Sequence, residues 1–228
     1  MQLVDGLFCP DATQRCLEHH PEFVNDPSKS ERCTRFAEPS VCESESRVMM
    51  RYCIDRYEWP NRAGATPQVL VDWREAAAQC EGAGKRLCDE SEWLFACEGE
   101  DMLPYTYGYL RDPTRCVLDR MHVDNGDALL PWESCMSSDA CRRSFERVDQ
   151  REPAGRFGEC RSPFGVFDMN GNVNEWVSLT GELAPHRAGL KGGWWGPVRS
   201  RCRPTVRSHS ELYRGYEVGF RCCRNALP

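Results

Sequence analysis

Apolar residues are sparse in the first 48 positions of this chain, and their pattern predicts few regular elements. Only residues 3–8, which read LVDGLF, have the character of a short strand, and four prolines break any long helix in the remainder. Residues 48–59 are richer in aromatic and branched side chains and predict a second strand, which ends before a turn at residues 60–64. A long polar loop therefore separates the two strands.

Two helices are predicted between residues 72 and 98 by their capping residues. Asp72 is a suitable N-cap, and the alanines that follow it favour a helix that ends near Gly82. Asp89 starts a second helix, because Glu92, three residues later, can complete a capping box. The residues expected on one face of this second helix are Trp93, Ala96 and Cys97.

From residue 97 to residue 165 the sequence has no helical or strand periodicity. Tyr105, Tyr107 and Tyr109 alternate there around Gly108. Such tyrosines can form a platform for a sugar or a peptide, since each ring offers flat apolar area with a polar tip. They can equally be packing residues that anchor a long loop. The sequence leaves both interpretations open.

The chain has 228 residues, enough for one large domain, and 15 of them are cysteines. Such a density is typical of oxidising compartments, and the sequence has no C-x-x-C pair of the kind that zinc sites use. We therefore expect mostly disulfides, one unpaired cysteine and an extracytoplasmic location, although no export signal is found at the N-terminus. Two local disulfides are expected in residues 1–48, and Cys135 is expected to pair with Cys141.

The formal net charge of −6 gives the chain no general attraction to nucleic acid. No apolar run approaches the roughly 20 residues that a membrane-spanning helix needs. Basic residues concentrate in one place, and buried pairing with carboxylates is their expected role. This arginine cluster comprises Arg199, Arg201, Arg203 and Arg207.

Residues 162–176, SPFGVFDMNGNVNEW, concentrate oxygen-bearing side chains around a glycine turn. Gly171 allows backbone angles closed to other residues, and the neighbouring Asp, Asn and Glu side chains supply oxygens, as in a calcium loop. The spacing differs from that of an EF-hand. The alternative is a loop that its own Asn and Asp side chains hold by hydrogen bonds to its backbone. Chemistry alone leaves both interpretations open.

Three ordered blocks of sequence resemble the formylglycine-generating enzyme family, also called sulfatase-modifying factors. Residues 167–176, FDMNGNVNEW, resemble the family signature D-M-x-G-N-V-x-E-W. Residues 84–93, GKRLCDESEW, resemble G-K-R-L-P-T-E-A-E-W, with Cys88 in place of the proline. Residues 191–194 and 219–222, KGGW and GFRC, resemble the terminal R-G-G-S and G-F-R-C blocks.

The resemblance covers residues 67–223 and implies a single domain over residues 1–228, in which residues 1–48 are a divergent segment stapled by cysteines. The implied fold class is α+β, an elaborated C-type-lectin-like fold that is rich in disulfides and has little regular secondary structure. This fold explains the missing periodicity. The disulfides that the resemblance implies are Cys80–Cys222 and Cys97–Cys202.

Enzymes of this family oxidise a cysteine of a sulfatase precursor to formylglycine, using oxygen and copper(I) held by two active-site cysteines. In these enzymes, the cysteine pair follows the G-G-S block. Here residues 192–202, GGWWGPVRSRC, form a shorter segment with no cysteine at either catalytic position. Cys202 matches a structural half-cystine of the family, and Trp194 replaces the serine with a large ring. Copper is therefore not expected, because a copper(I) site of this kind needs two thiolates.

A second enzymatic branch of the family uses non-haem iron and a histidine triad from an additional N-terminal helical domain, for which this sequence has no match. His122, His186 and His209 are too dispersed in the sequence to suggest such a triad. His19 and His20 are adjacent, and we expect them to be solvated loop residues.

We therefore expect a secreted or surface-exposed domain that keeps the family scaffold, lacks formylglycine-generating activity and acts as a binding or structural module. The alternative is a metal-dependent oxidoreductase of the same superfamily that uses other active-site residues, since fold alone does not decide function. The partner would be a protein, a peptide or a glycan. The residues of the candidate ligand face are Trp194, Trp195, Tyr105 and Tyr107.

The resemblance also implies one structural calcium ion in the loop of residues 162–176. The family's other calcium site is matched less well, because residues 116–118 lack the expected Asn. The implied calcium ligands are side-chain oxygens of Asp168 and Glu175 and the backbone carbonyls of Gly171 and Val173.

Overall fold

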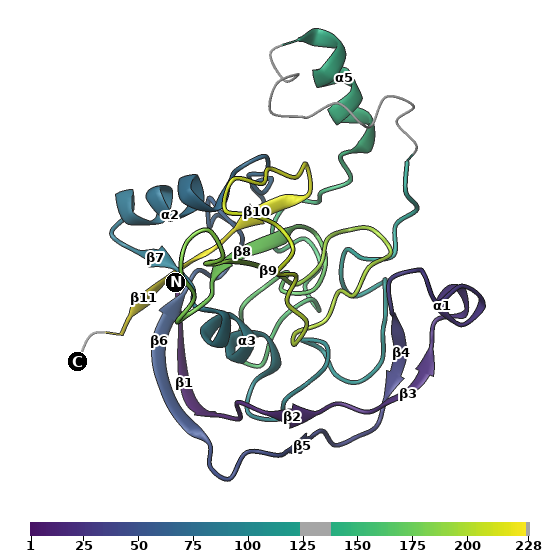
Figure 1. Cartoon of the computed structure of the whole chain (residues 1–228), viewed down its shortest axis with the longest axis vertical. Helices are drawn as coiled ribbons and strands as arrows, with labels where there is room; N and C mark the ends of the chain where they lie inside the picture. Colours follow the sequence, from purple (N-terminus) through teal and green to yellow (C-terminus); the bar gives the residue numbers. More distant parts are fainter. Residues whose placement is uncertain (124–137, 227–228) are drawn as a thin grey trace.

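The computed structural model describes residues 1–123 and 138–226 and has the expected α+β architecture with little regular secondary structure (Figure 1). Its helices are α1 (Pro21–Asn25), α2 (Trp73–Gly82), α3 (Glu90–Glu98) and α5 (Asp139–Val148). Its strands are β1 (Gln2–Phe8), β2 (Ala12–Thr13), β3 (Cys16–His19), β4 (Cys33–Phe36), β5 (Val41–Cys42), β6 (Val48–Ile54), β7 (Arg86–Leu87), β8 (Asn174–Ser178), β9 (Ala188–Lys191), β10 (Val218–Phe220) and β11 (Cys222–Asn225).

The two strands predicted in the N-terminal quarter pair with each other along their whole length. β1 and β6 are antiparallel, and β11 adds the C-terminal segment to β6, which gives a sheet of order β1-β6-β11-β7. β6 ends at Ile54 rather than continuing to Trp59 as predicted. The reason is that the Asp55 carboxylate is buried against the Lys85 ammonium, 2.6 Å away, so the chain turns inward there.

A second sheet carries the sequence block that the family signature matches. β8 lies between β10, to which it is parallel, and β9, to which it is antiparallel. Its residues are almost all buried. Figure 1 shows α3 close to the centre of the body, below this sheet.

Both predicted helices begin at the expected residues. The backbone N–H of Glu75 donates to the Asp72 carboxylate at 2.8 Å, and the N–H of Asp89 donates to the Glu92 carboxylate at 2.9 Å. α3 differs from the prediction, because it is buried on nearly every side rather than on one face. Core residues from β1, β6 and β8 surround it, so its apolar residues show no single stripe.

The segment predicted to be irregular contains one regular element, α5. Ser138 caps this helix by accepting a hydrogen bond from the N–H of Cys141 at 3.2 Å. Most of α5 faces solvent, and the helix stands away from the body in Figure 1. The predicted pairing of Cys135 with Cys141 involves a residue outside the described ranges.

Disulfides join the elements in two ways. Local bridges staple the N-terminal segment, as expected, and long-range bridges tie α2, Cys88 (the residue after β7) and α3 to the C-terminal part of the chain. The two disulfides implied by the family resemblance are confirmed. The described bridges are Cys9–Cys42, Cys16–Cys33, Cys80–Cys222, Cys88–Cys223, Cys97–Cys202 and Cys116–Cys160. Within the ranges that the structure describes, Cys53 is free.

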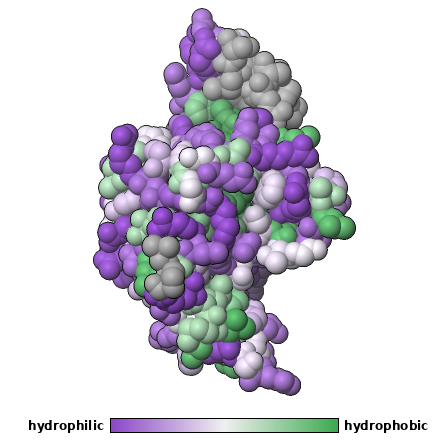
Figure 2. Space-filling view, turned by 90° about the vertical axis from the view of Figure 1, so that its left-hand side faces the viewer, coloured by the Kyte–Doolittle hydropathy of each residue, from purple (hydrophilic) through white to green (hydrophobic). Residues whose placement is uncertain are grey.

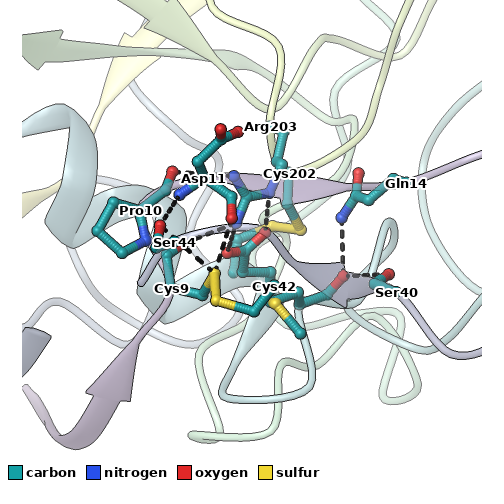
Figure 3. Close-up of polar contacts among 12 residues, drawn as sticks. Cys9, Pro10, Asp11, Gln14, Ser40, Cys42, Ser44, Cys202 and Arg203 are labelled. Atoms are coloured by element: carbon teal, nitrogen blue, oxygen red, sulfur yellow. Dashed lines mark hydrogen bonds and ion pairs between the residues drawn. A yellow bond between two sulfur atoms is a disulfide. The ribbon is translucent and has the colours of Figure 1, made fainter. Parts of the chain in front are cut away.

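The arginine cluster behaves only in part as predicted. The Arg203 guanidinium pairs with the buried Glu98 carboxylate at 2.7 Å and donates to the carbonyls of Cys9 and Pro10 (Figure 3). This arginine therefore joins the N-terminal segment to α3. Arg207 instead makes an exposed pair with Glu90. A further connection in Figure 3 runs from the side chains of Gln14 and Ser40 to the carbonyl of Met102.

The alternating tyrosines are packing residues that also attach the N-terminal segment to the body of the domain. Tyr105 is completely buried, and its hydroxyl donates to the carbonyl of Cys33 at 2.5 Å. The Tyr107 ring stacks on it with 5.6 Å between centroids. Tyr109 accepts a hydrogen bond from the N–H of Ser40 through its hydroxyl. These contacts anchor the N-terminal segment, which favours the packing interpretation of the tyrosines.

The outer face of the β1–β6 pair carries several exposed apolar side chains. Leu3, Leu7 and Met49 are each more than two-fifths exposed and lie on this face by their strand register. Figure 2 shows this side of the molecule. An apolar patch is visible in the lower part of the view, and the surface above it is largely hydrophilic. None of the described helices is long and apolar enough to cross a membrane.

Removal of the Cys97–Cys202 disulfide tests the role of the long-range bridges. A Cys97→Ala/Cys202→Ala double variant should lower the free energy of unfolding by roughly 2–5 kcal/mol, because the bridge closes a loop with a sequence separation of 105 residues. Denaturant unfolding measures the change, and Cys53→Ser is the control that should stay within about 0.5 kcal/mol of the wild type. Equal stability of the double variant and the wild type would contradict the prediction.

Candidate functional site

The loop of residues 168–175 turns tightly, and three of its residues adopt left-handed backbone conformations. Asp168, Gly171 and Asn172 have φ angles of 59°, 82° and 56°. A Cβ atom on Gly171 would lie 2.1 Å from the carbonyl oxygen of Val117, so only glycine fits at that position. The N–H of Asn172 donates to the same Val117 oxygen at 2.8 Å. The loop therefore packs directly on the segment of residues 116–118.

A buried ion pair lies at the end of this loop. The Arg221 guanidinium donates to both oxygens of the Glu175 carboxylate at 2.6 Å, and the indole N–H of Trp93 donates to one of them at 2.7 Å. Arg221 and Glu175 are both completely buried. Arg221 also donates to the carbonyl oxygens of Asp55 and Phe167. The pair thus connects β8 and two loops with the residue that lies between β10 and β11.

Two further carboxylates lie near the Arg221 guanidinium. Burial raises the pKa of Glu58 well above its usual range, and the charges of Asp168 and Glu175 raise it further. Burial also raises the pKa of Asp168, to about 6, against the lowering effect of a hydrogen bond from the N–H of Gly155. Three buried carboxyl groups therefore surround one guanidinium, an excess of negative charge when all are ionised.

The four predicted calcium ligands are close in sequence, but they differ in how many hydrogen bonds their oxygens already accept. The carbonyl oxygens of Gly171 and Val173 accept no backbone hydrogen bond from the described residues. Asp168 uses one carboxylate oxygen for Gly155, whereas both Glu175 oxygens already accept from Arg221. No group of three or more His, Cys, Asp or Glu side chains in the described ranges is arranged to hold a metal ion. The donor set that fits calcium is thus two carbonyls and one open carboxylate, with Glu175 shared.

The Asn side chains of the loop mostly reach other segments rather than their own backbone. The Asn170 side-chain oxygen accepts from the N–H of Thr106 at 2.7 Å. The Asn172 amide donates to Glu58 at 2.8 Å, and its oxygen accepts from the N–H of Glu152 at 2.9 Å. These bonds fix the loop by tertiary contacts, which the sequence interpretation of a self-bonded loop did not include.

A pocket of about 180 Å³ opens beside the turn of residues 192–194. Asn174 of β8 and Glu217, the residue before β10, line it and are called its polar floor here. Residues of the segment 198–209 line it as well, and Ser30 reaches it from the N-terminal segment. We call this cavity the Trp194 pocket. Its lining residues with polar side chains are Ser30, Asn174, Arg199, His209 and Glu217.

The predicted ligand face is only partly accessible. Trp195 and Tyr105 are buried, so they offer no surface to a ligand, and their inclusion was wrong. The reason for Trp195 is that its N–H donates to the carbonyl of Asn172, which turns the ring into the core. Trp194 lines the Trp194 pocket, whereas Tyr107 lines a different surface hollow. The four residues do not form one face.

The sequence interpretation missed the polar floor of the pocket. Glu217 and Asn174 are 43 positions apart, yet the N–H of Asn174 donates to the carbonyl of Glu217 at 2.8 Å where β8 and β10 pair. The only local signal was the position of both residues inside or beside the blocks that resemble the family. His209 stacks on Tyr213 with 3.8 Å between ring centroids.

The segment between Gly193 and Cys202 is tightly packed and offers no free thiol for redox chemistry. A Cβ atom on Gly193 would lie 2.4 Å from the hydroxyl of Ser200, so this segment folds tightly back on the turn. Cys202 is completely buried and bonded to Cys97. It is therefore a structural half-cystine, as the family resemblance implies.

Comparison with known families identifies the scaffold. The profile described as "Sulfatase-modifying factor enzyme 1-like domain" matches residues 25–226, which extends the expected match into the N-terminal segment. "Inactive C-alpha-formylglycine-generating enzyme 2" of Mus musculus is 28% identical over 168 residues, covering 70% of this chain and 49% of that protein. "Formylglycine-generating enzyme" of Mycobacterium tuberculosis is 32% identical over 131 residues, covering 55% of this chain and 36% of that protein. The chain thus spans half or less of the length of these curated relatives.

Solved structures share the fold at low sequence identity. PvdO from Pseudomonas aeruginosa superposes with a TM-score of 0.58 at 16% identity and covers 98% of this chain and 94% of its own. CarF superposes with a TM-score of 0.60 at 12% identity and covers 83% of this chain and 92% of its own. At such identities the likeness concerns the fold alone.

Proposed function

Because the chain belongs to the family of sulfatase-modifying factor enzyme 1-like domains, we propose that it is a ligand-binding domain of this family without formylglycine-generating activity. Its relatives include a protein named as inactive and one named as an enzyme, so family membership alone leaves the activity open. Residues 194–202 favour the inactive alternative, because their single cysteine, Cys202, is bonded in a structural disulfide.

The observation that carries the binding role is the Trp194 pocket. Apolar and polar side chains both line it, Glu217 among them has a buried carboxylate oxygen without a hydrogen-bond partner, and Trp194 stands where the family sequence has a small serine. A concave site with apolar walls and a few convergent polar groups is the usual form of a small-ligand site. The many disulfides support an extracytoplasmic location for this binding role.

We also propose one structural calcium ion at the loop of residues 168–175. Support comes from the Gly171 and Val173 carbonyls, which accept no backbone hydrogen bond from the described residues, and from the excess of carboxylates around Arg221. Asp168, Gly171, Val173 and Glu175 would hold the ion, and calcium prefers such oxygen ligands. The ion would fix the loop that carries Asn174 toward the pocket.

Incubation with copper(I), oxygen and a peptide that carries a sulfatase modification motif should leave the peptide cysteine unchanged. The physical reason is that no pair of thiolates is present to bind copper(I) after Gly193. Mass spectrometry of the peptide measures the outcome, with an active enzyme of the family as the positive control. An aldehyde product formed by this chain would contradict the proposal.

The binding role predicts saturable ligand effects at the Trp194 pocket. A set of about 20 Nα-acetyl amino acid N-methylamides, one for each standard side chain, should include at least one that shifts the NMR signals of the Gly192 and Gly193 amides. Signals from α5, which lies away from the pocket, are the internal control. A set in which no member causes a saturable shift would reject the binding role for small side-chain ligands.

Calcium removal should lower the melting temperature, because an ion bound only by the folded loop stabilises the folded state. Asp168→Gly should abolish this calcium dependence without backbone strain, since glycine readily adopts the φ of 59° found there. Asn61→Gly is the matched control, because Asn61 has a φ of 58° and lies outside the proposed ligand set. Thermal unfolding with and without chelator measures both variants. An unchanged melting temperature of the wild type, together with no calcium in metal analysis, would show that the loop needs no ion.

A further inference from the structure

Glu217 is a buried carboxylate with an unused oxygen in the Trp194 pocket. The residue is only 9% exposed and lines the cavity. Its Oε1 atom accepts a hydrogen bond from the Tyr213 hydroxyl at 3.2 Å, but its Oε2 atom has no hydrogen-bond partner. Buried polar atoms in folded proteins almost always have a partner, because leaving one unsatisfied is costly. The orphan oxygen therefore calls for a donor from outside the chain.

The backbone around Glu217 fixes the position of this buried oxygen, which has almost no solvent-accessible surface. The pairing of β10 with β8 fixes the position of the residue, since its carbonyl accepts from the N–H of Asn174. A Cβ atom on Gly215 would lie 2.6 Å from Glu217 Oε2, so any other residue there would crowd the oxygen. The absence of a side chain at position 215 thus lets the carboxylate lie against the backbone, where its Oε2 atom has no hydrogen-bond partner.

The other residues that line the pocket indicate which kind of hydrogen-bond donor would fit beside Glu217. The apolar part of the lining suits an alkyl chain, and the Trp194 ring can add a cation–π contribution. A donor that carries a positive charge gains most from a buried carboxylate. The apolar side chains of the wall belong to Leu190, Trp194, Val198, Pro204 and Val206.

The other charged or titratable groups of the pocket do not replace this donor. Arg199 is exposed to solvent, and no ion pair joins it to Glu217 in the described part of the chain. Burial lowers the pKa of His209, which keeps its imidazole neutral at physiological pH. A negatively charged ligand would have to approach Arg199 and would be repelled by Glu217. Ligand and pocket are therefore complementary when the ligand is a cation.

We propose that the Trp194 pocket binds a primary amine on an alkyl chain, with the lysine side chain of a peptide as the fitting form, and that the ammonium group donates to Glu217 Oε2. The alkyl chain lies along the apolar wall, and the peptide backbone remains at the opening near Arg199. This inference rests on the proposed binding role and specifies the chemistry of its ligand.

The test uses the full chain and three soluble probes in calorimetric and NMR titrations. Nα-acetyl-lysine N-methylamide should bind at least about tenfold more tightly than Nα-acetyl-norleucine N-methylamide, which has the same alkyl chain without the ammonium group. Nα-acetyl-glutamate N-methylamide reports on binding through Arg199 instead. Glu217→Gln should remove the preference for lysine over norleucine. Glu182→Gln, a change of an exposed glutamate outside the pocket, is the matched control and should preserve it.

The outcomes separate this inference from the binding role. Preferential binding of the glutamate probe, or equal binding of lysine and norleucine, would leave a binding domain in place but overturn the amine specificity. Retention of the full lysine preference in a folded Glu217→Gln protein would also overturn it. If none of the three probes shifts the Gly192 and Gly193 amides, the amine inference falls, and the binding role falls with it only if the full set of N-methylamides also gives no saturable shift. Because Glu217 supports no strand hydrogen bond through its side chain, circular dichroism of the variant should match the wild type.

Discussion

The ion pair between Arg221 and Glu175 is the interaction on which the remainder of this structure depends. Both side chains are completely buried, and the guanidinium also binds backbone oxygens of two separate loops. A buried charge that loses its partner typically costs several kcal/mol, so neither residue can be changed alone without a large penalty. The pair therefore holds β8, the link between β10 and β11, and the loop of residues 168–175 in one arrangement. β8 is also the strand that carries Asn174, a lining residue of the pocket.

A protein with so little regular secondary structure must hold its loops by other means. In the N-terminal segment, the local disulfides and Arg203 do this, because the guanidinium joins Glu98 of α3 to the backbone at residues 9 and 10 (Figure 3). Tyr105 adds a buried hydrogen bond to the same segment. Ser30 consequently reaches the Trp194 pocket from a part of the chain that has few apolar residues of its own. The pocket is assembled from loops whose positions are set by charge pairs and bridges.

Local signals in the sequence predicted the elements that are decided locally. The caps at Asp72 and Asp89 are such signals, since each depends on residues no more than three positions away. The disulfides of Cys80 and Cys97 followed from the family resemblance rather than from spacing. Trp194 and Trp195 show the limit, because adjacent residues of one type differ in burial only through the tertiary course of the turn. The contact between Glu217 and Asn174 is of the same kind, since it arises from parallel strand pairing across 43 positions.

The long-range bridges also constrain how the protein can be made. Cys80, Cys88 and Cys97 all pair with cysteines at positions 202, 222 and 223, which the ribosome adds only after more than a hundred further residues. The three earlier thiols must therefore remain unpaired, or exchange out of incorrect bridges, until the C-terminal strand has been synthesised. Cys222 and Cys223 are adjacent in the chain but bond to different partners, so an exchange of these two partners is the simplest error available. Native production consequently requires that oxidation of these thiols be delayed until the C-terminal cysteines are present, or that thiol–disulfide exchange correct the bridges afterwards.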